Sequence, residues 1–364
     1  MIWKLSAFHH SSFIIPRELK VADLKTYQVQ AGWLKAATDA LKAAKVMVLA
    51  PREEDGGVAL QPVNGSRDGL ASEYVNTVLP LKRAFLPASE VLLEYKREGA
   101  NIDLMPVAPD PAESVVIGSR PCDAAALEML DSVFQWDYDD LPYRARREHT
   151  TVVTFACTKP DATCFCTSVG GSPANTRGSD VLVFRAADGS ALLQVLSGKG
   201  DAFVAKLGSL AKPANAAPPA APAMPPKFDV GKIKQWLDGN FQSTFWADAA
   251  MRCLGCGACS YVCPTCHCFD IVDESIWDRG QRRRNWDCCS FALFTKHASG
   301  HNPRGDQAAR YRQRVMHKFK YFPERFGRTA CVGCGRCLRT CGVGQNLVNV
   351  LSAIEKTTAG GAAK

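Results

Sequence analysis

Residues 253–264 read CLGCGACSYVCP, and residues 331–341, CVGCGRCLRTC, repeat the same cysteine spacing. Three closely spaced thiolates can take three corners of one iron–sulfur cube. The fourth cysteine, one helical turn on, points away and ligates the cube of the other run. The spacing therefore predicts a two-[4Fe–4S], ferredoxin-like domain. Its expected ligands are Cys253, Cys256, Cys259 and Cys341 for the first cluster and Cys331, Cys334, Cys337 and Cys263 for the second.

The two runs begin 78 residues apart, far more than a two-cluster ferredoxin needs. We therefore interpret residues 269–328 as an insertion, which we expect to be helical and basic. Between Arg279 and Arg328, thirteen Lys or Arg stand against three Asp or Glu, whereas the net charge of the whole chain is +8. Because an oxidised cube with four thiolates carries about 2−, these cations are expected first to compensate cluster charge and second to form a docking face for an acidic partner. Two structural zinc ions are the alternative to the cubes, but zinc does not require this ligand order.

Residues 1–210 predict a mixed α/β domain. Short apolar runs bounded by turn residues indicate buried strands, and longer runs rich in Ala, Leu and Met indicate helices. The turn residues Asp188-Gly189 indicate a β hairpin. The expected strands are 45–51, 114–118 and 150–156, the expected helices 31–44 and 123–134, and the expected hairpin 181–195.

Residues 211–227, AKPANAAPPAAPAMPPK, contain six prolines and almost no large apolar side chain. Such a composition is typical of a semi-rigid linker, which is either free or wrapped along a domain surface. We therefore expect a domain boundary here, with the dicluster domain at 228–356 and a flexible tail at 357–364. The expected fold class is α+β.

Four further cysteines lie in the α/β domain. Cys122 occupies a turn from a strand into a helix, and Cys157, Cys164 and Cys166 follow the strand at 150–156. The ends of neighbouring parallel strands open onto the same edge of a sheet, so these thiols can converge. A thiol at a helix N-terminus also has a lowered pKa, which suits a metal ligand. We predict a third [4Fe–4S] cluster here, with a zinc site or unliganded cysteines as alternatives.

The last four cysteines are Cys266, Cys268, Cys288 and Cys289. Cys266 and Cys268 follow Cys263 so closely that they can act as small apolar residues that shield the cluster. The other reading is a fourth metal site, with Cys266, Cys268 and Cys289 as extra ligands.

The composition bounds the class of protein. Sixteen cysteines in tight spacing, without an export signal at residues 1–16, indicate metal binding rather than a disulfide framework. No stretch approaches the roughly 18 consecutive apolar residues that a membrane span needs. We expect a cytoplasmic protein.

The sequence has no phosphate-binding loop and no nucleophile motif. Aromatic residues among the basic ones can mimic a nucleic-acid surface, but the cysteine spacing favours an electron carrier, and we expect no nucleic-acid partner.

Several segments, in this order along the chain, resemble the beta subunit of cytosolic nickel–iron hydrogenases (sulfhydrogenases) and the closely similar A subunit of anaerobic sulfite reductase. The resemblance runs from about residue 75 to residue 350. The segments that carry it are IGSRPCDAAALEMLD, CTKPDATCFC, CLGCGACSYVCPTCHCFDIVD, RRRNWDCCSF, HNPRGDQAARYRQRVMHKFKYFPE and CVGCGRCLRTC.

The resemblance implies an iron–sulfur subunit that passes electrons between a flavin-containing, pyridine-nucleotide-oxidising subunit and a catalytic subunit of hydrogenase or sulfur/sulfite reductase type. The sequence departs from the relatives at Cys288, where they tend to have a small residue other than cysteine, at Gly342 in place of proline, and in the Ala/Pro linker. A rival hypothesis is a self-sufficient reductase of sulfur compounds that uses an extra iron site at Cys266, Cys268, Cys288 and Cys289.

Overall fold

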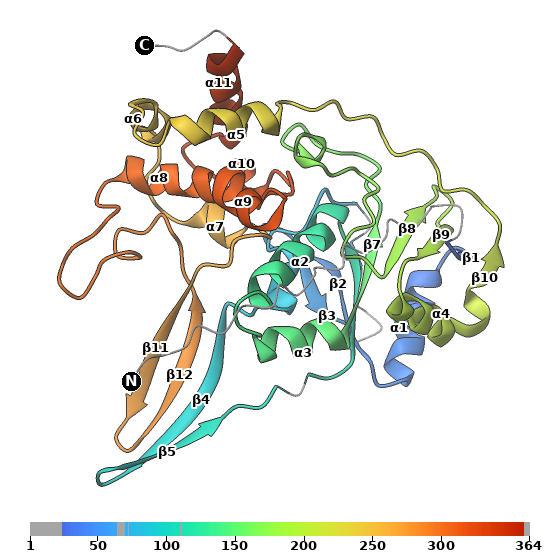
Figure 1. Ribbon diagram of the computed structural model, residues 1–364. Helices are drawn as coiled ribbons and strands as arrows, with labels where there is room; N and C mark the ends of the chain where they lie inside the picture. The colour runs from blue at the N-terminus through green and yellow to red at the C-terminus, as the bar shows by residue number, and fades with distance from the viewer. Residues whose placement is uncertain (1–23, 64–69, 72, 110, 360–364) are drawn as a thin grey trace, which may run out of the picture.

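The computed structural model describes residues 24–63, 70–71, 73–109 and 111–359. Figure 1 shows an eight-stranded sheet with helices on both faces, a four-stranded sheet that extends from the body, and a group of helices formed by the last third of the chain. This arrangement confirms the expected α+β fold. The amino-terminal residues from which we argued against an export signal lie outside the described residues.

The larger sheet has the strand order β10-β1-β9-β8-β7-β6-β2-β3, and its four strands from β8 to β2 run parallel. Both β6 and β7 are buried at every position, as expected for Val- and Ile-rich strands covered on both faces. The predicted strands and the predicted hairpin are confirmed. The strands are β1 (Thr26–Val29), β2 (Met47–Glu54), β3 (Gly57–Pro62), β6 (Ser114–Ser119), β7 (Thr150–Phe155), β8 (Val181–Arg185), β9 (Ala191–Val195) and β10 (Lys212–Ala214).

Helices cover the two faces of this sheet. On one face, α1 (Trp33–Ala43) and α4 (Gly198–Leu207) bury an apolar stripe against Val115 and Val153. On the other face, α2 (Pro121–Phe134) and α3 (Leu141–His149) pack on Val116 and Val152, the next residues along the same strands. Both helices expected in this region, α1 and α2, are confirmed.

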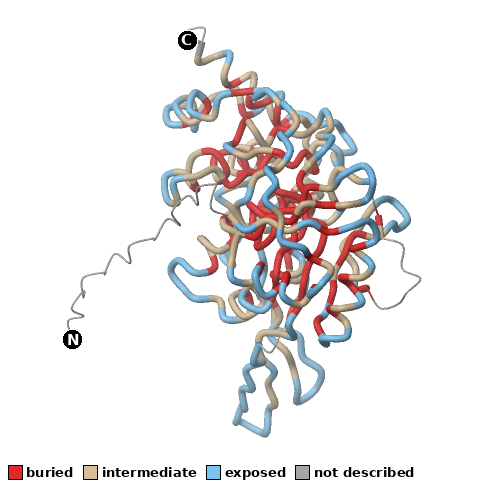
Figure 2. The backbone as a smooth tube through the Cα atoms, turned by 90° about the vertical axis from the view of Figure 1, so that its right-hand side faces the viewer, coloured by how far each residue is buried: buried red, intermediate tan, exposed pale blue. Residues whose placement is uncertain are grey.

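The smaller sheet has the order β11-β12-β4-β5 and is antiparallel throughout. Its strands are β4 (Ser89–Glu98), β5 (Asn101–Pro106), β11 (Phe269–Ile276) and β12 (Arg279–Trp286). We expected the basic insertion to be helical, but its first part is the β11–β12 hairpin. Asp273 lies directly opposite Arg282 in this hairpin, and such cross-strand pairs of opposite charge favour it. Figure 2 shows that the far end of this sheet is largely exposed.

The remaining helices form the carboxyl-terminal part. They are α5 (Val230–Gly239), α6 (Phe245–Ala250), α7 (Ala258–Tyr261), α8 (Gln307–Met316), the π-helical turn η5 (His317–Tyr321), α9 (Phe322–Phe326), α10 (Arg336–Arg339) and α11 (Leu347–Ala359). Residues 215–229 carry no helix or strand. Of the expected tail at 357–364, the first three residues continue α11 and the others lie outside the described residues. No helix in the described ranges is long and apolar enough to cross a membrane. The division into domains stays a prediction.

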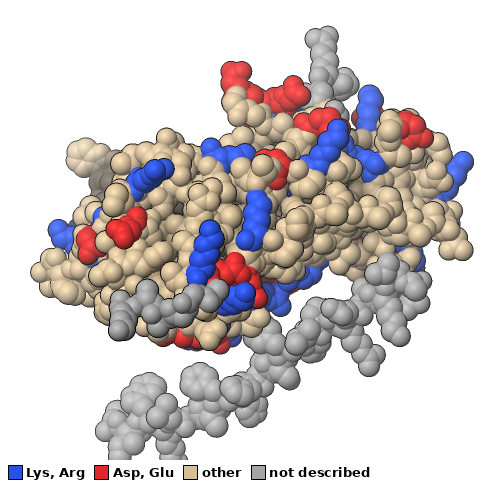
Figure 3. All heavy atoms as spheres, turned by 90° about the horizontal axis from the view of Figure 1, so that it is seen from above, with Lys and Arg blue, Asp and Glu red and all other residues tan. Residues whose placement is uncertain are grey.

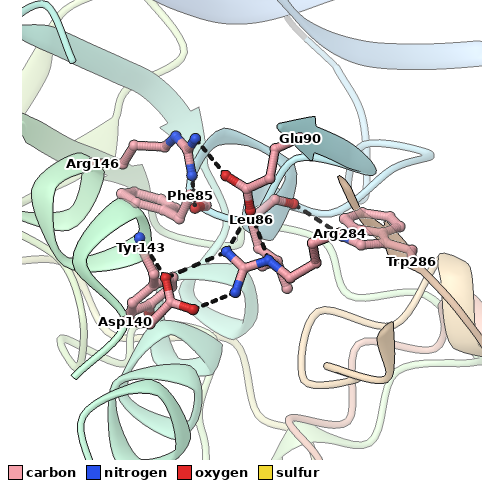
Figure 4. A network of polar contacts seen from close by, with 8 residues as sticks. All are labelled: Phe85, Leu86, Glu90, Asp140, Tyr143, Arg146, Arg284 and Trp286. Carbon is pink, nitrogen blue, oxygen red and sulfur yellow. Dashed lines mark hydrogen bonds and ion pairs between the residues drawn. The ribbon is translucent and has the colours of Figure 1, made fainter. Parts of the chain in front are cut away.

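A buried network of charges attaches the hairpin to the α/β body (Figure 4). The guanidinium of Arg284 in β12 pairs with Glu90 of β4 and with Asp140, whose carboxylate also caps α3. Glu90 pairs in addition with Arg146 at 2.7 Å. The side chains of Arg284 and Glu90 are only 3% and 7% exposed, so each charge depends on its partner.

We expect Arg284→Leu to destabilise the protein by about 3–5 kcal/mol, because it leaves the buried carboxylate of Glu90 with one cation fewer. The matched control is Arg282→Leu in the same strand, whose pair with Asp273 is about half exposed and which should cost less than about 1 kcal/mol. Anaerobic denaturant unfolding of both variants measures the difference. Equal midpoints for the two variants would contradict this reading of the network.

Candidate metal centres

The two cysteine runs adopt the same backbone. In the first run Gly255 and Gly257 have φ of +68° and +78°, and in the second Gly333 and Gly335 have φ of +63° and +75°. Glycine takes these left-handed conformations at little cost. A short helix begins directly after the second glycine of each run, α7 in one case and α10 in the other. The repeated spacing therefore builds a repeated loop.

The structure brings the four cysteines expected at the first cluster to one cavity, which Cys253, Cys256, Cys259 and Cys341 line together with Cys337. Nitrogen donors already point at two of the sulfurs. The side chain of Gln307 donates to Cys253 Sγ at 3.2 Å, and the main-chain N–H of Gln345 donates to Cys341 Sγ at 3.2 Å. Such bonds stabilise thiolates and tune a bound cluster.

The cysteines expected at the second cluster lie deeper. Burial first, and then the neighbouring thiols including Cys263, raise the pKa of Cys331 to about 12. The same causes raise the pKa of Cys334 and of Cys337 above its usual range. Lys318 donates to Cys263 Sγ at 3.4 Å. Three of these four cysteines, Cys263, Cys331 and Cys334, are buried, and the buried Lys318 contacts the first of them.

The third expected set also converges, because Cys122, Cys157, Cys164 and Cys166 all line one cavity of about 230 Å³. Cys122 is the second residue of α2, just after β6, and Cys157 follows the end of β7. These strands are parallel neighbours, so their ends open onto the same edge, as we predicted. The 3-10 helix η3 (Cys166–Val169) contributes the last thiol.

One expectation about Cys122 is wrong. We expected the helix N-terminus to lower the pKa of this thiol, but burial, followed by the nearby Asp123 and Cys334, raises it well above its ordinary value. Burial also raises the pKa of Cys164 to about 11 and of Cys166 to about 12. A coordinated metal cation reverses such a preference, because a ligating thiol is deprotonated outright.

Arg120, which stands two residues before Cys122, lines the same cavity. The side chain is buried, lies 4.1 Å above the Tyr74 ring and donates to the Tyr74 carbonyl. Its Nε and Nη1 atoms have no hydrogen-bond partner in the described structure. Buried donors without partners are costly. An anionic group in the cavity would satisfy them, so the residues present fit an iron–sulfur cluster.

The remaining cysteines are Cys266, Cys268, Cys288 and Cys289. Arg314 donates to Cys266 Sγ at 3.6 Å, and the thiol of Cys288 donates to Ser260 Oγ at 3.2 Å. Within the part of the chain that the structure describes, no three His, Cys, Asp or Glu side chains converge on a single metal ion. A [4Fe–4S] cube would not require such convergence, because each of its four cysteines would bind a different iron.

The basic residues of the insertion have two environments. Arg314 and Lys318 are buried beside the thiols, as expected for compensation of cluster charge. Others pair with carboxylates, as Arg328 does with Glu128 at 2.6 Å. On the face shown in Figure 3, Lys and Arg are interspersed with Asp and Glu rather than gathered in one patch. Lys82 lies outside the insertion, and no sequence pattern singled it out. Like Arg314 and Lys318 it is buried, and it donates to the Cys266 carbonyl at 2.7 Å.

Direct contacts join the second and third sets. Arg336 of α10 forms two 2.7 Å hydrogen bonds with Asp123 of α2, and both side chains are 2% exposed. The Phe165 N–H donates to the Gly333 carbonyl at 2.8 Å. The side chain of Asn76 donates to the Cys334 carbonyl at 2.9 Å. The loops of the two sets are therefore packed as one unit.

Comparison with known proteins agrees with this geometry. Residues 252–345 match a family described as a 4Fe-4S dicluster domain, which spans both runs and implies two [4Fe–4S] clusters. The third set lies outside the matched residues. The sulfhydrogenase 2 subunit beta of Pyrococcus furiosus is 30% identical over 322 residues, which are 85% of this chain and 92% of that relative.

We expect Gly333→Ala to weaken the packing between the second and third sets. A Cβ at Gly333 would lie 2.4 Å from the main-chain nitrogen of Cys166, and main-chain atoms cannot move aside easily. Gly344→Ala is the matched control, because Gly344 has a similar φ of +65° but open space around it. The control should lower the free energy of unfolding by only the roughly 1–2 kcal/mol of left-handed strain. Gly333→Ala should lower it by clearly more. Anaerobic thermal unfolding tests this, and equal losses would refute it.

Proposed function

Because this chain belongs to the family of sulfhydrogenase beta subunits, we propose that it is the electron relay of a multi-subunit oxidoreductase. It is an iron–sulfur electron-transfer subunit of a sulfhydrogenase-like complex. In the finer proposal it passes single electrons between a subunit that binds flavin and pyridine nucleotide and a catalytic subunit of hydrogenase or sulfur/sulfite reductase type. The chain's own part is to hold the clusters and set their surroundings.

We assign the ligands as the spacing predicts. When bound, each [4Fe–4S] cube exchanges one electron, which suits the stepwise handling of a flavin's two electrons. The chain supplies thiolates, N–H donors to their sulfurs, and buried cations that offset their charge. The proposed ligands are Cys253, Cys256, Cys259 and Cys341 for the first cube and Cys331, Cys334, Cys337 and Cys263 for the second.

A third cube, held by Cys122, Cys157, Cys164 and Cys166, is part of the proposal. Two observations support it: four thiols line a single cavity, and the buried guanidinium of Arg120 has donors without partners on the same cavity wall. A zinc ion bound by four thiolates would also be anionic. The volume of about 230 Å³ and the shared wall with Cys334 favour a cube that takes part in the relay.

The arrangement of the thiols supports an order for the three sets. Cys334 lines the cavity of the third set, whereas Cys337 lines the cavity of the first. Both belong to the second set, so the second set lies between the other two. This linear order is the observation that carries the proposed function, because a relay needs adjacent carriers, whereas a lone substrate site does not.

The first set reaches the molecular surface. Cys256 is exposed, and next to this run the apolar side chains of Leu254 and Met251 are 76% and 78% exposed. We propose this loop as one end of the relay, where a partner subunit approaches. Exposed apolar side chains beside a buried cofactor are typical of interaction sites. The cytoplasmic location predicted from the sequence stays a prediction.

We expect Cys164→Ser to lower the iron content by about four atoms per chain and to leave the two ferredoxin-like clusters in place. The reason is that Cys164 lines only the cavity of the third set. The measurement is iron and acid-labile sulfide in anaerobically prepared full-length protein, with electron paramagnetic resonance of the reduced state. Cys288→Ser is the control and should keep all the iron. Unchanged iron in Cys164→Ser would remove the third cube from the proposal.

The isolated chain should accept electrons from dithionite but should not turn over substrate. We expect no hydrogen evolution and no reduction of sulfite or polysulfide until the catalytic partner is added, because we assign none of the described residues to a substrate site. Reduction by a pyridine nucleotide should likewise require the flavin subunit. Spectral bleaching and product assays measure both. Turnover of sulfite or polysulfide by the chain alone, with an artificial donor, would favour the self-sufficient reductase instead.

A further inference from the structure

The side-chain amide of Gln307 lies against the first cysteine run. Gln307 is the first residue of α8 and follows Asp306, whose side chain caps the helix by accepting the Ala309 N–H at 2.7 Å. The amide Nε2 of Gln307 donates to Cys253 Sγ at 3.2 Å. A Cβ on Gly255 would lie 2.8 Å from the Gln307 Oε1. The amide therefore occupies the space that this glycine leaves open beside the first set.

Arg310, about one helical turn after Gln307, binds the other end of the same amide. Its Nε and Nη2 donate to Gln307 Oε1 at 3.1 and 2.9 Å. A guanidinium has five N–H donors and no acceptor, so only the oxygen of the amide can face it. The nitrogen of the amide is then directed toward the sulfur. Arg310 thus determines which end of the Gln307 amide points at Cys253.

Two main-chain carbonyls hold Arg310 itself in place. Its Nη1 donates to the carbonyls of Arg304 and Gly305, at 3.0 Å in each case. Neither these carbonyls nor the Gln307 amide carries a net charge, so these contacts do not cancel the positive charge of the guanidinium. That charge polarises the amide, and a polarised amide is a stronger donor.

A glutamine at this depth needs a partner to keep such a bond. Gln307 and Arg310 are both half-buried, and Cys256 of the same set is exposed, so water can compete for the amide. Fixing a glutamine side chain also costs rotamer freedom. The donor to Cys341, in contrast, is the main-chain N–H of Gln345, whose direction the backbone sets. The side-chain donor is therefore the one that requires a positioning residue.

We propose that Arg310 is a positioning residue for the first cube and acts through the Gln307 amide. By holding the amide N–H on the Cys253 sulfur, it makes this cube easier to reduce. Reduction adds one electron to the cube and makes its sulfurs more negative, so a donor on a sulfur stabilises the reduced state more than the oxidised state. The inference rests on the proposed function, because it needs Cys253 as a ligand of the first cube.

The first two variants test the donor. Full-length protein, prepared anaerobically, is titrated with dithionite in the presence of redox mediators and followed by electron paramagnetic resonance. Gln307→Met removes the N–H, so the potential of one cube should move to a more negative value while the others keep theirs. Gln307→Glu should move the same cube further in that direction, because a carboxylate accepts from Arg310 but donates nothing to the sulfur. Unchanged potentials in both variants would rule out the proposal.

A double variant separates the positioning role of Arg310 from its charge. Arg310→Met alone should move the potential of the same cube to a more negative value. When Gln307→Met is already present, adding Arg310→Met should produce no further shift, because no amide remains to be held. If the two shifts instead add, Arg310 acts through its own charge and the proposal fails.

Arg312→Met is the control for charge. It removes one positive charge from the same helix, but Arg312 donates to the Phe241 carbonyl at 3.2 Å and lies 3.9 Å above the Phe241 ring. All potentials should stay at the values of the unsubstituted protein. A shift of the first cube as large as that in Arg310→Met would contradict a role through Gln307.

Iron content shows whether each variant has kept its cubes. Loss of about four irons per chain in Arg310→Met would mean that the residue holds the loop rather than the amide, and would overturn the proposal. These outcomes differ from a failure of the proposed function. In that case the unsubstituted protein would itself lack the ferredoxin-like cubes, and both proposals would fall together.

Discussion

A thiol must lose its proton to bind iron, and burial opposes that loss. The interior of this protein raises the pKa of Cys166 and of Cys331 to about 12 each, with desolvation as the largest cause. Iron itself overcomes part of this cost, and buried cations beside the sulfurs overcome another part. Buried cations lie beside each set. Arg120 lines the cavity of the third set, Lys318 contacts Cys263 of the second set, and Arg314 lines the cavity of the first set.

The cations come from segments that are distant in sequence, so the metal sites need the amino- and carboxyl-terminal parts together. Lys82 belongs to the first 100 residues, yet it contacts the loop after Cys263. Arg336 belongs to the second run, yet its carboxylate partner Asp123 lies on α2. Each part therefore completes the electrostatics of the other. The cysteines of each set come from one part, whereas some of the charged groups around them come from the other, so docking of the two parts completes the surroundings of the metal sites.

The sequence was informative where the signal is local. Cysteine spacing predicted both runs, and two apolar strands followed by cysteines predicted that Cys122 and Cys157 would meet at one sheet edge. Contacts between distant segments carried no such signal. The pairing of β12 with β4 depends on Arg284 meeting Glu90, 194 residues away, which no periodicity reveals. Lys82 likewise lacks any neighbouring motif. Arg120 stands two residues before Cys122, so the sequence could have predicted a place for it beside the third set.

The π-helical turn between α8 and α9 shows how backbone and charge serve the same end. Pro323 has no N–H to donate to the carbonyl groups one turn before it, so the regular helical pattern fails at this point. The Lys318 carbonyl instead accepts the N–H of Ala330 at 2.9 Å, while the Lys318 ammonium donates to the Ala330 carbonyl at 2.8 Å. Ala330 directly precedes Cys331. Lys318 therefore holds the start of the second cysteine run with its backbone carbonyl, and its side chain places a positive charge beside Cys263.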